Sequence, residues 1–492
     1  MRGIASPVTD VRRKVFTEVA RMSYEGEVNE SYATQMRRMP FRIVPGQQGV
    51  HQQNIFLERA IVSERVRLAM GLALRPLDQQ VSTGEGIEHS IIADKYYDPP
   101  LINIIKFACN SCPEKMVKVS HFCQGCLAHP CQQVCPKKAI SFKNNMSHID
   151  QSLCIKCGLC IQACPYNAIV KTERPCAMAC GMNAIHSDEL GRADIDYSKC
   201  VSCGMCLVNC PFGAISDKGQ IFQLIQSIKR GDRVYALIAT AKLRAAMQQL
   251  GFEDVVEVAI GADLCTVDEA KDFLEEVPAK KSFMATSCCP SWSMMAKTLF
   301  PELAGNISMA MTPMVFTARM MKKADPEARM CFVGPCAAKK LEASRRHVRS
   351  DVDFVLTFEE LAGMFEAKGV DFTHLDDMET EDTMVYASSA GRGFAASGGV
   401  AKAVADQIHK WYPDKEVKIA SAQGLAECRK LLTMAKLGKY DGYLLEGMGC
   451  PGGCIAGAGT LADPRKTAAV LAKYTAQAVL KDPEESAFIS NI

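Results

Sequence analysis

Cysteine runs dominate the chemistry that this sequence could perform. In residues 154–164 and 200–210, three cysteines are separated by two residues each, and a fourth follows after three more, directly before proline. This spacing is typical of 4Fe–4S binding, because three thiolates on one tight loop hold one cluster while the fourth serves its neighbour. Residues 123–135 form a variant with a longer second gap, whereas residues 109–112 and 176–180 carry split halves.

The number of cysteines suits four clusters. Sixteen lie between residues 109 and 210, which gives four ligands to each cluster with none left over. A zinc site uses cysteine pairs rather than three cysteines within seven residues, so zinc is the weaker alternative, above all for the two complete runs. The neighbour rule predicts four ligand sets. They are Cys123, Cys126, Cys131 with Cys164; Cys154, Cys157, Cys160 with Cys135; Cys200, Cys203, Cys206 with Cys180; and Cys109, Cys112, Cys176 with Cys210.

A second group of cysteines lies in three short segments of the later chain, residues 286–292, 334–340 and 446–454. Each segment combines cysteine with proline or glycine, which suits a tight loop at the end of a strand, where open α/β sheets place ligands. We expect these loops to form one metal site. Its candidate ligands are Cys289, Cys336, Cys450 and Cys454. The single cysteines in apolar or helical contexts are expected to be core residues; these are Cys265, Cys331 and Cys428.

The elements that must position these loops change in character along the chain. From residue 220 onward, apolar runs such as 234–239 predict buried parallel strands that alternate with helices such as 268–276. Residues 1–105 contain no cysteine and have the apolar spacing of helices. We therefore predict an α/β catalytic domain of two lobes with parallel sheets, preceded by α+β ferredoxin-like Fe–S domains and a helical N-terminal segment. The predicted boundaries are 1–105, 106–218 and 219–492.

Composition excludes two classes of partner. The chain has 492 residues and a formal net charge of +2, so nothing indicates binding to nucleic acid. No run approaches the roughly 18 apolar residues that a membrane span requires. Arg12-Arg13 is followed by charged residues rather than by the apolar stretch of an export signal. The expected location is the cytoplasm, where cysteines stay reduced.

Together, the segments TSCCPSW, PCAAKKLE and EGMGCPGGC resemble the three signature segments of the FeFe-hydrogenases. The similarity covers about residues 105–492. It implies the reversible interconversion of H₂ with two protons and two electrons. It also implies an H-cluster, which is a 4Fe–4S cube joined by one thiolate to a two-iron unit with CO, cyanide and azadithiolate ligands. The resemblance makes Cys289, Cys336, Cys450 and Cys454 its ligands, with Cys454 as the bridge.

The resemblance also assigns residues around the two-iron unit. Lys339 matches the lysine that hydrogen-bonds a cyanide, since an anionic ligand in a dry pocket requires a cation. Glu342 would hold Lys339 in place, and Met448 matches the methionine packed by the bridging CO. Ala239 is counted among the cofactor contacts.

A proton relay is implied next to this site. Cys288 matches the thiol that passes a proton to the bridgehead amine. Glu269 aligns with the inner relay carboxylate, Asp272 with the outer one and Ser308 with the relay serine. A relay needs titratable groups within hydrogen-bond reach. The alternative for Glu269 and Asp272 is a solvated helix face, because their i, i+3 spacing allows both readings.

Four positions depart from the familiar pattern. Gly334 replaces a methionine, Thr240-Ala241 replaces a Pro-Ser pair near the cyanide, and Met314 replaces a glutamine. These changes remove a thioether, a hydroxyl and an amide from the surroundings of the metal, which tune its potential. With the four-cluster block, they resemble the hydrogenases often labelled group B.

The expected partners are H₂ and protons as substrates, the hydrogenase maturation enzymes, and ferredoxin or a similar electron carrier. Lysines that crowd the cluster block could steer an acidic carrier, although a plain solvated surface explains them equally well; they are Lys115, Lys118, Lys137, Lys138 and Lys143. Two alternatives remain open at this stage. One is a hydrogen sensor with low turnover, and the other is a hydrogenase-like Fe–S assembly or scaffold protein that lacks the two-iron unit.

Overall fold

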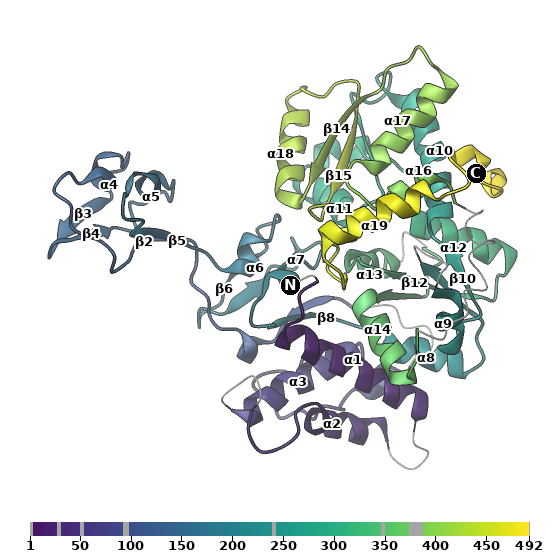
Figure 1. Ribbon diagram of the computed structural model, residues 1–492, viewed down its shortest axis with the longest axis horizontal. Helices are drawn as coiled ribbons and strands as arrows, with labels where there is room; N and C mark the ends of the chain where they lie inside the picture. Colours follow the sequence, from purple (N-terminus) through teal and green to yellow (C-terminus); the bar gives the residue numbers. More distant parts are fainter. Residues whose placement is uncertain are drawn as a thin grey trace.

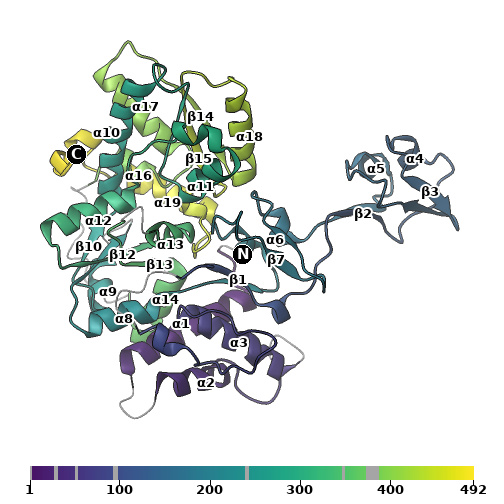
Figure 2. The ribbon, with the colours of Figure 1, turned by 180° about the vertical axis from the view of Figure 1, so that it is seen from behind.

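The computed structural model describes most of the chain, and Figures 1 and 2 show it from opposite sides. The described residues are 3–26, 31–49, 54–91, 98–238, 243–345, 350–372 and 387–491.

The N-terminal segment is helical, as predicted. It contains α1 (Pro7–Glu25), α2 (Tyr32–Ile43) and α3 (Ile55–Ala69). Helix α1 begins at Pro7 because the Ser6 side chain accepts a hydrogen bond from the Thr9 amide, while the Thr9 hydroxyl accepts one from the Ser6 amide. The buried face of α1 packs on α8 (Ile221–Lys229) and α14 (Phe358–Lys368). The segment therefore shares one hydrophobic core with the first lobe of the α/β domain.

The ferredoxin-like part has an inner and a distal unit. The inner unit contains β1 (Ile102–Ile104), β6 (Ile185–Ser187), β7 (Ala193–Ile195), β8 (Ile215–Asp217), α6 (Pro175–Met178) and α7 (Met205–Asn209). The distal unit contains β2 (Met116–Val119), β3 (Ile140–Lys143), β4 (Met146–Ile149), β5 (Ile169–Thr172), α4 (Pro130–Gln133) and α5 (Leu159–Ala163). All their strand pairs are antiparallel. Because β1 pairs with β8, this part of the fold begins before the predicted boundary at residue 105.

The distal unit extends away from the body of the molecule, and the β2–β5 pair forms its stem (Figure 1). We call residues 116–172 the distal lobe. The antiparallel register places Val119 opposite Ile169. The two ends of the lobe are therefore side by side.

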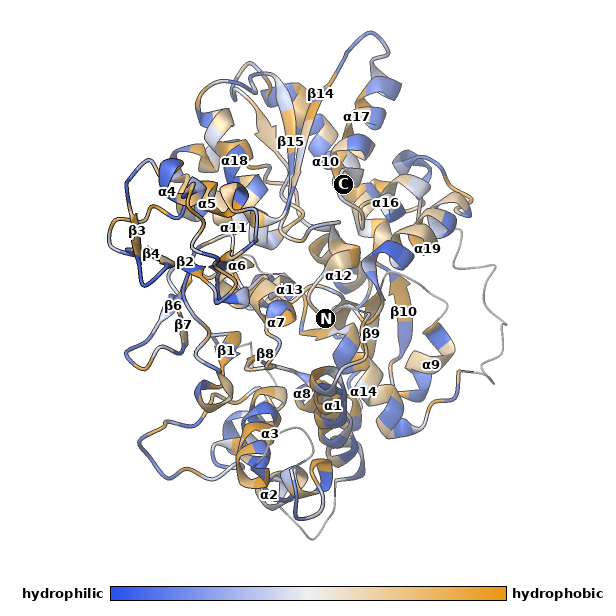
Figure 3. Ribbon diagram, turned by 60° about the vertical axis from the view of Figure 1, so that its left-hand side comes forward, coloured by the Kyte–Doolittle hydropathy of each residue, from blue (hydrophilic) through white to orange (hydrophobic). Residues whose placement is uncertain are grey.

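The first lobe of the α/β domain is built on a parallel sheet with the strand order β10-β9-β12-β13. Its elements are β9 (Val234–Ile238), β10 (Asp254–Glu257), β12 (Arg329–Gly334), β13 (Phe354–Thr357), α8, α9 (Arg244–Gln249), α12 (Pro313–Ala324), α13 (Ala338–Ala343) and α14. The strands are mostly hydrophobic (Figure 3). Alternate residues face opposite sides: Val234 and Ala236 contribute to the core shared with α1, and Leu237 packs with Met314 and Val315 of α12.

The second lobe has the parallel order β11-β15-β14. Its elements are β11 (Met284–Ala285), β14 (Lys418–Gln423), β15 (Tyr443–Met448), α10 (Ala259–Glu276), α11 (Pro290–Leu299), α16 (Ser389–Gly393), α17 (Gly399–Trp411), α18 (Leu425–Lys436) and α19 (Pro464–Ala476). Residues of α11 and α18 pack on one face of this sheet, and those of α10 and α17 pack on the other.

Short 3-10 turns complete the fold; they span Ile87–His89, Lys106–Ala108, Pro301–Asn306, Cys454–Ala456, Pro483–Glu485 and Ile489–Asn491. Two parallel sheets preceded by ferredoxin-like units and a helical segment are the predicted fold class, which is confirmed. Across the described residues, no helix is long and apolar enough to cross a membrane.

Candidate functional site

Three strands from the two lobes deliver the candidate site. Residues 286–289 follow β11, Pro335 and Cys336 follow β12, and residues 449–454 follow β15. Strands β11 and β15 are neighbours in the second lobe, whereas β12 lies in the sheet of the first lobe. Each cysteine segment therefore lies at the carboxyl end of a parallel strand, as the sequence predicts, and the site forms between the lobes.

The four candidate ligand cysteines lie near one another and are partly buried. Burial raises the pKa of Cys336 to about 11 and that of Cys454 to about 12, and the neighbouring Cys289 adds to both shifts. Burial also raises the pKa of Cys450 well above its ordinary value, with additional contributions from Cys336 and Cys289. Thiolates that are so disfavoured alone become stable ligands when iron supplies the positive charge. The donor set thus fits a 4Fe–4S cube.

Backbone groups are aimed at these sulfurs. The Gly449 amide donates to Cys289 Sγ at 3.3 Å. The amides of Ala338 and Lys339, at the start of α13, hydrogen-bond Cys336 and partly offset the rise in its pKa. Gly453 has φ of +88°, and a Cβ there would come within 2.5 Å of the Ser397 amide nitrogen, so the turn before Cys454 requires glycine. Hydrogen bonds from N–H groups to cysteine sulfurs are one of the factors that set the reduction potential of an iron–sulfur cluster.

Lys339 is a buried cation beside the thiols. Its ammonium donates to Glu342 Oε2 at 2.7 Å and to the Cys288 carbonyl oxygen at 3.4 Å. Thr312 Oγ1 in turn donates to Glu342 Oε1 at 2.8 Å. Although burial opposes it, the charge of Glu342 holds the pKa of Lys339 above its ordinary value, and Cys336 and Cys288 add to this effect. The lysine is therefore kept charged inside the site.

Cys288 and Met448 line the same hydrophobic cluster. Met448 ends β15 and is 2% exposed. Cys288 is buried, and this burial raises the pKa of its thiol well above the ordinary value, with a further contribution from Glu269. Cys288 therefore stays protonated and can hold a proton next to the four thiols.

Glu269 is fully buried on α10 and accepts a hydrogen bond from the Ser287 amide at 3.0 Å. Burial raises its pKa to about 7, and hydrogen bonds from Ser287 and proximity to the Ser308 hydroxyl limit the rise. Glu269 Oε2 has no hydrogen-bond partner within the described part of the chain. Such a carboxyl can gain and lose a proton near neutral pH.

Asp272 lies on the same side of α10 and is half-buried, and its charge contributes to the raised pKa of Glu269. Burial raises the pKa of Asp272 as well, with Asp268 and Glu276 adding to the rise. The order Cys288, Glu269, Asp272 therefore leads from the buried site toward solvent. The solvated-face alternative does not describe Glu269, which is 0% exposed.

The structure adds residues that the sequence argument did not select. Cys265 lies one turn before Glu269 on α10 and affects the pKa of Cys288. Glu446 accepts the amides of Gly398 at 2.6 Å and Ala401 at 2.8 Å, which anchors the third cysteine segment to the start of α17. Thr312 orients Glu342. Only Glu446 has a local signal, since it precedes the Gly-Met-Gly-Cys run in the sequence.

Two of the departures lie next to the site. Gly334 ends β12, and a Cβ there would meet the Phe332 ring at 2.7 Å. The phenyl ring thus fills space that a side chain at position 334 would need. Met314 is buried in the same hydrophobic cluster as Phe332. Ala239, Thr240 and Ala241 lie outside the described residues.

Three cavities of the ferredoxin-like part are lined by cysteines. Each is bordered by four of them, in the sets that the neighbour rule assigned to single clusters. The sets are Cys123, Cys126, Cys131 and Cys164; Cys135, Cys154, Cys157 and Cys160; and Cys109, Cys112, Cys176 and Cys210. The remaining set also lies together, because Cys180 and Cys200 both raise the pKa of Cys203 and Cys206, after burial as the main cause.

The last of these sets meets the candidate site. After burial as the main cause, Cys289 contributes to the raised pKa of Cys203, and Cys203 contributes to the raised pKa of Cys450. The backbone at Gly204 packs closely against Ala337 and Ala458. A Cβ on Gly204 would lie 2.5 Å from the Ala458 Cβ and 3.2 Å from the Ala337 Cβ. This contact brings a ferredoxin-type loop against the second cysteine segment and against the chain that follows the third.

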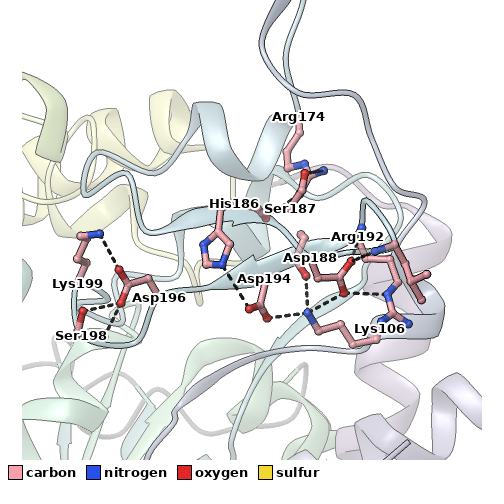
Figure 4. Close-up of polar contacts among 12 residues, drawn as sticks. Lys106, Arg174, His186, Ser187, Asp188, Arg192, Asp194, Asp196, Ser198 and Lys199 are labelled. Carbon is pink, nitrogen blue, oxygen red and sulfur yellow. Dashed lines mark hydrogen bonds and ion pairs between the residues drawn. The ribbon is translucent and has the colours of Figure 1, made fainter.

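Polar contacts hold the inner ferredoxin unit together (Figure 4). Arg174 is 3% exposed and precedes Cys176. It donates to the Cys112 carbonyl at 2.9 Å, and it also contacts the β6–β7 hairpin through the His186 carbonyl at 2.9 Å. Lys106 joins the turn before Cys109 to Asp194 at 2.6 Å. These contacts fix the two split cysteine halves relative to each other.

Comparisons with known proteins agree with this geometry. Residues 232–458 match the family model for the C-terminal domain of the iron-only hydrogenase large subunit. Residues 147–170 and 193–216 match the 4Fe-4S binding domain.

Curated relatives include both enzymes and assembly factors. The periplasmic Fe hydrogenase large subunit of Nitratidesulfovibrio vulgaris is 30% identical over 45% of this chain and 62% of its own length. Iron hydrogenase 1 of Clostridium pasteurianum is 28% identical over 46% of each chain. The cytosolic iron-sulfur assembly component 3 of Bos taurus is 24% identical over 45% of this chain and 57% of its own. The matched region thus spans only 46 to 62% of these relatives. The chain carries an FeFe-hydrogenase-like large-subunit domain preceded by 4Fe–4S ferredoxin motifs.

Proposed function

We propose that this protein is an FeFe-hydrogenase of the group B type that interconverts H₂ with two protons and two electrons. It would work in the cytoplasm, after the hydrogenase maturation enzymes have supplied the two-iron unit. Cys289, Cys336, Cys450 and Cys454 would hold the H-cluster, and the sixteen upstream cysteines would hold four 4Fe–4S clusters. A reducing compartment suits a chain whose cysteines are all free thiols.

The observation that supports this proposal most strongly is the Lys339–Glu342 pair. A site that holds only a 4Fe–4S cube needs four thiols, and four are present without Lys339. Keeping a charged lysine buried requires a carboxylate partner, which Glu342 provides at 2.7 Å. This arrangement is useful where an anionic ligand such as cyanide accepts the remaining N–H groups of the lysine.

The other residues follow from this assignment. When bound, the H-cluster supplies the iron chemistry that makes and splits H₂. Met448 would pack against its carbonyl ligand and keep water away, because its side chain is buried with Cys288. The amides of Gly449, Ala338 and Lys339 would hydrogen-bond ligand sulfurs. They thereby favour the more reduced state of the cube.

Protons would move through the chain's own groups. Cys288 holds the proton nearest the site, and the buried Glu269, whose pKa is about 7, exchanges it. Ser287 and Ser308 orient Glu269, and the half-buried Asp272 connects it with solvent. Glu269 can gain and lose a proton near neutral pH because burial raises its pKa to about 7.

A second candidate function comes from the similarity to cytosolic iron–sulfur assembly component 3. An assembly protein would carry the cubes without the two-iron unit. In that case Lys339, Glu342 and Cys288 would form a buried polar group with no ligand to serve. The two functions therefore differ in one measurable quantity, the presence of diatomic ligands.

Infrared spectroscopy separates the candidates. The protein is produced with and without the maturation enzymes, and the second sample is the control. Bands of CO and cyanide in the matured sample alone would support the hydrogenase. Absence of these bands, with about 20 iron atoms still bound per chain, would contradict it and favour the assembly protein.

The distal lobe provides the surface for an electron carrier. Large apolar side chains around its cysteine loops are exposed, with Phe122 at 74%, Leu127 at 95% and Ile155 at 57%. Cys157 in one of these loops is itself exposed. Exposed lysines occur on the distal lobe and directly before it; these are Lys115, Lys118, Lys137, Lys138, Lys143 and Lys171. An apolar centre with a basic rim fits an acidic protein carrier such as a ferredoxin.

A loop replacement tests this docking surface. Because Val119 and Ile169 are paired, a short glycine linker can replace residues 120–168 and remove eight cysteines. A milder variant, Lys137→Glu with Lys138→Glu, keeps the clusters, and Lys418→Glu on the exposed strand β14 is its control. We expect the lysine variant to lose activity with ferredoxin and keep it with a small dye. Equal rates of the lysine variant and its control with ferredoxin would contradict this docking site.

A further inference from the structure

A group of buried charges connects the N-terminal helix with the candidate site. Arg12 of α1 is 6% exposed and donates to Glu359 Oε2 at 2.6 Å and to Asp217 Oδ1 at 3.3 Å. It also donates to the Ser216 hydroxyl at 3.2 Å. Residues 216 and 217 belong to β8 and lie six and seven residues after Cys210. One side chain of the N-terminal segment thus contacts both the ferredoxin-like part and α14.

Asp217 passes the connection on to α13. Its other oxygen, Oδ2, accepts a hydrogen bond from Lys340 Nζ at 2.7 Å. Lys340 is 0% exposed and also reaches the Lys218 carbonyl at 2.8 Å and Glu360 Oε2 at 2.9 Å. Although burial opposes it, Lys340 and Arg12 hold the pKa of Asp217 below its ordinary value, so Asp217 is ionised. Asp217 is therefore the link that joins the two cations.

Lys340 lies directly after Lys339 in α13, a helix of six residues. The amides of Ala338 and Lys339 at its start face the Cys336 sulfur, and the Lys339 ammonium meets Glu342. A short helix has little stability of its own, so its position depends on what holds its side chains. The ion pairs of Lys340 with Asp217 and Glu360 hold α13 in place, and the one with Asp217 connects the helix to Arg12.

We infer that Arg12 is a positioning residue for the metal site. Through Asp217 and Lys340 it fixes α13, and α13 sets the hydrogen bonds to the Cys336 sulfur and the place of Lys339. This gives the N-terminal helical segment a role in the chemistry, beyond covering the first lobe. The inference rests on the proposed function only in that Cys336 ligates a cube, and it does not require the two-iron unit.

Loss of Arg12 has a defined consequence. Arg12 and Lys340 are two cations that pair with three carboxyl groups, those of Asp217, Glu359 and Glu360, and all of these groups are at least partly buried. Burial raises the pKa of Glu360, so Asp217 and Glu359 are the carboxylates that depend most on the two cations. Without Arg12, the remaining carboxylates are short of a cation in a buried region, which such a network does not tolerate. Lys340 is then drawn toward the unbalanced carboxylates, and α13 moves with it.

The test uses the full chain carrying its 4Fe–4S clusters but produced without the maturation enzymes. Arg12→Met is compared with Arg12→Lys and with Val19→Ala. Val19 is 0% exposed on the same helix and takes no part in the ion pairs, so its truncation destabilises α1 through packing alone. Each variant is measured at a urea concentration chosen so that Arg12→Met and Val19→Ala have the same free energy of unfolding.

Two readouts follow α13. Hydrogen–deuterium exchange reports on the amides of residues 338–343, with α18 as an internal reference, and we expect on the order of tenfold faster exchange of α13 in Arg12→Met. Potentiometric EPR reports on the cube held by Cys336. Its midpoint potential is expected to become more negative as N–H groups leave the sulfur. Arg12→Lys keeps the charge and is expected to restore most of both properties.

The outcomes separate positioning from general stability. Faster exchange and a shifted potential in Arg12→Met but not in Val19→Ala support the inference. Equal changes in both variants, or an unchanged α13 in Arg12→Met, overturn it. If Arg12→Met does not fold, Glu359→Gln replaces it, because that change weakens Arg12 while keeping Asp217 and Lys340 paired. Since no sample contains the two-iron unit, missing infrared bands would refute the proposed function without affecting this result.

Discussion

The ammonium of Lys339 lies 2.7 Å from the carboxylate of Glu342, one helical turn later in α13. Both side chains are 9% exposed, so neither charge is solvated by bulk water. Thr312 donates a hydrogen bond to the other carboxylate oxygen, Oε1, so Glu342 directs its Oε2 at the lysine. The direction of the Lys339 ammonium is thus determined by a residue on α13 and by the turn before α12.

Removal of the carboxylate tests this arrangement. Glu342→Gln leaves a buried ammonium without its counter-charge, and loss of one partner of a buried pair costs about 3–5 kcal/mol. We expect the free energy of unfolding to fall by about that amount, as measured by urea titration of the chain without the two-iron unit. The exposed Glu327→Gln is the matched control. A Glu342→Gln chain as stable as this control would show that the lysine is not held as a charged group.

The pH dependence of stability offers a separate prediction. Asp263 is 0% exposed, and burial raises its pKa from 3.8 to about 7, opposed by hydrogen bonds from Ser388. Because the folded pKa lies above the unfolded one, the native state retains a proton that the unfolded chain loses between about pH 4 and pH 7. The contribution of Asp263 to the free energy of unfolding is therefore fully present below about pH 4. About 4 kcal/mol of this contribution is lost as the pH rises to 7.

Asp263→Asn removes this dependence, since the amide cannot ionise. Urea unfolding at pH 4.5 and pH 7.5 is expected to show a smaller loss of stability in Asp263→Asn than in the natural chain. Asp406→Asn, at an exposed position on α17, serves as the control and should leave the pH profile as it was. Parallel profiles for all three proteins would mean that Asp263 titrates normally.

Arg174 is predicted to be essential for one cluster. It joins the Cys112 carbonyl to the hairpin that follows Cys176, so Arg174→Met separates the two split cysteine halves. We expect the iron content to fall by about four atoms per chain while the H-cluster domain stays folded. Lys199→Met is the control, because Lys199 pairs with Asp196 near the surface. Full iron content in Arg174→Met, measured together with EPR, would disprove this scaffold role.

Glu269→Gln tests the proton route. The amide still accepts the Ser287 hydrogen bond but cannot transfer a proton, so turnover of the matured enzyme is expected to fall by about 100-fold or more. The infrared bands of the cofactor should remain. Glu275→Gln lies on the same helix at an exposed position and should turn over normally. A Glu269→Gln enzyme that matches Glu275→Gln would mean that protons use another path.

Features with local spacing could be predicted from the sequence. The ligand cysteines repeat at fixed intervals, because one loop must wrap one cluster, and the structure groups them as that rule requires. The pairing of Lys339 with Glu342 is implied by the resemblance to the FeFe-hydrogenases, and helix geometry allows it, since i, i+3 positions of a helix are neighbours. The parallel sheets follow from apolar runs such as residues 234–238.

Features that depend on tertiary contacts could not be predicted. Thr312 reaches Glu342 from 30 residues away, and Arg12 reaches Asp217 from 205 residues away. The N-terminal helices show only amphipathic spacing, which predicts that they pack but not on what. Phe332 beside Gly334 is similar, because a glycine alone does not show which side chain fills its space. Local spacing also does not show that β1 pairs with β8. The predicted domain boundary at residue 105 therefore lies after β1 instead of before it.

The central claim is that this chain interconverts H₂ with protons and electrons through a thiol-linked proton route. Film electrochemistry of the matured protein under H₂ tests it directly, with Cys288→Ala as the matched variant. The account predicts catalytic currents in both directions for the natural chain, and currents reduced by about 100-fold or more for Cys288→Ala with its infrared bands intact. No catalytic current from matured protein, or equal currents from the two proteins, would contradict it.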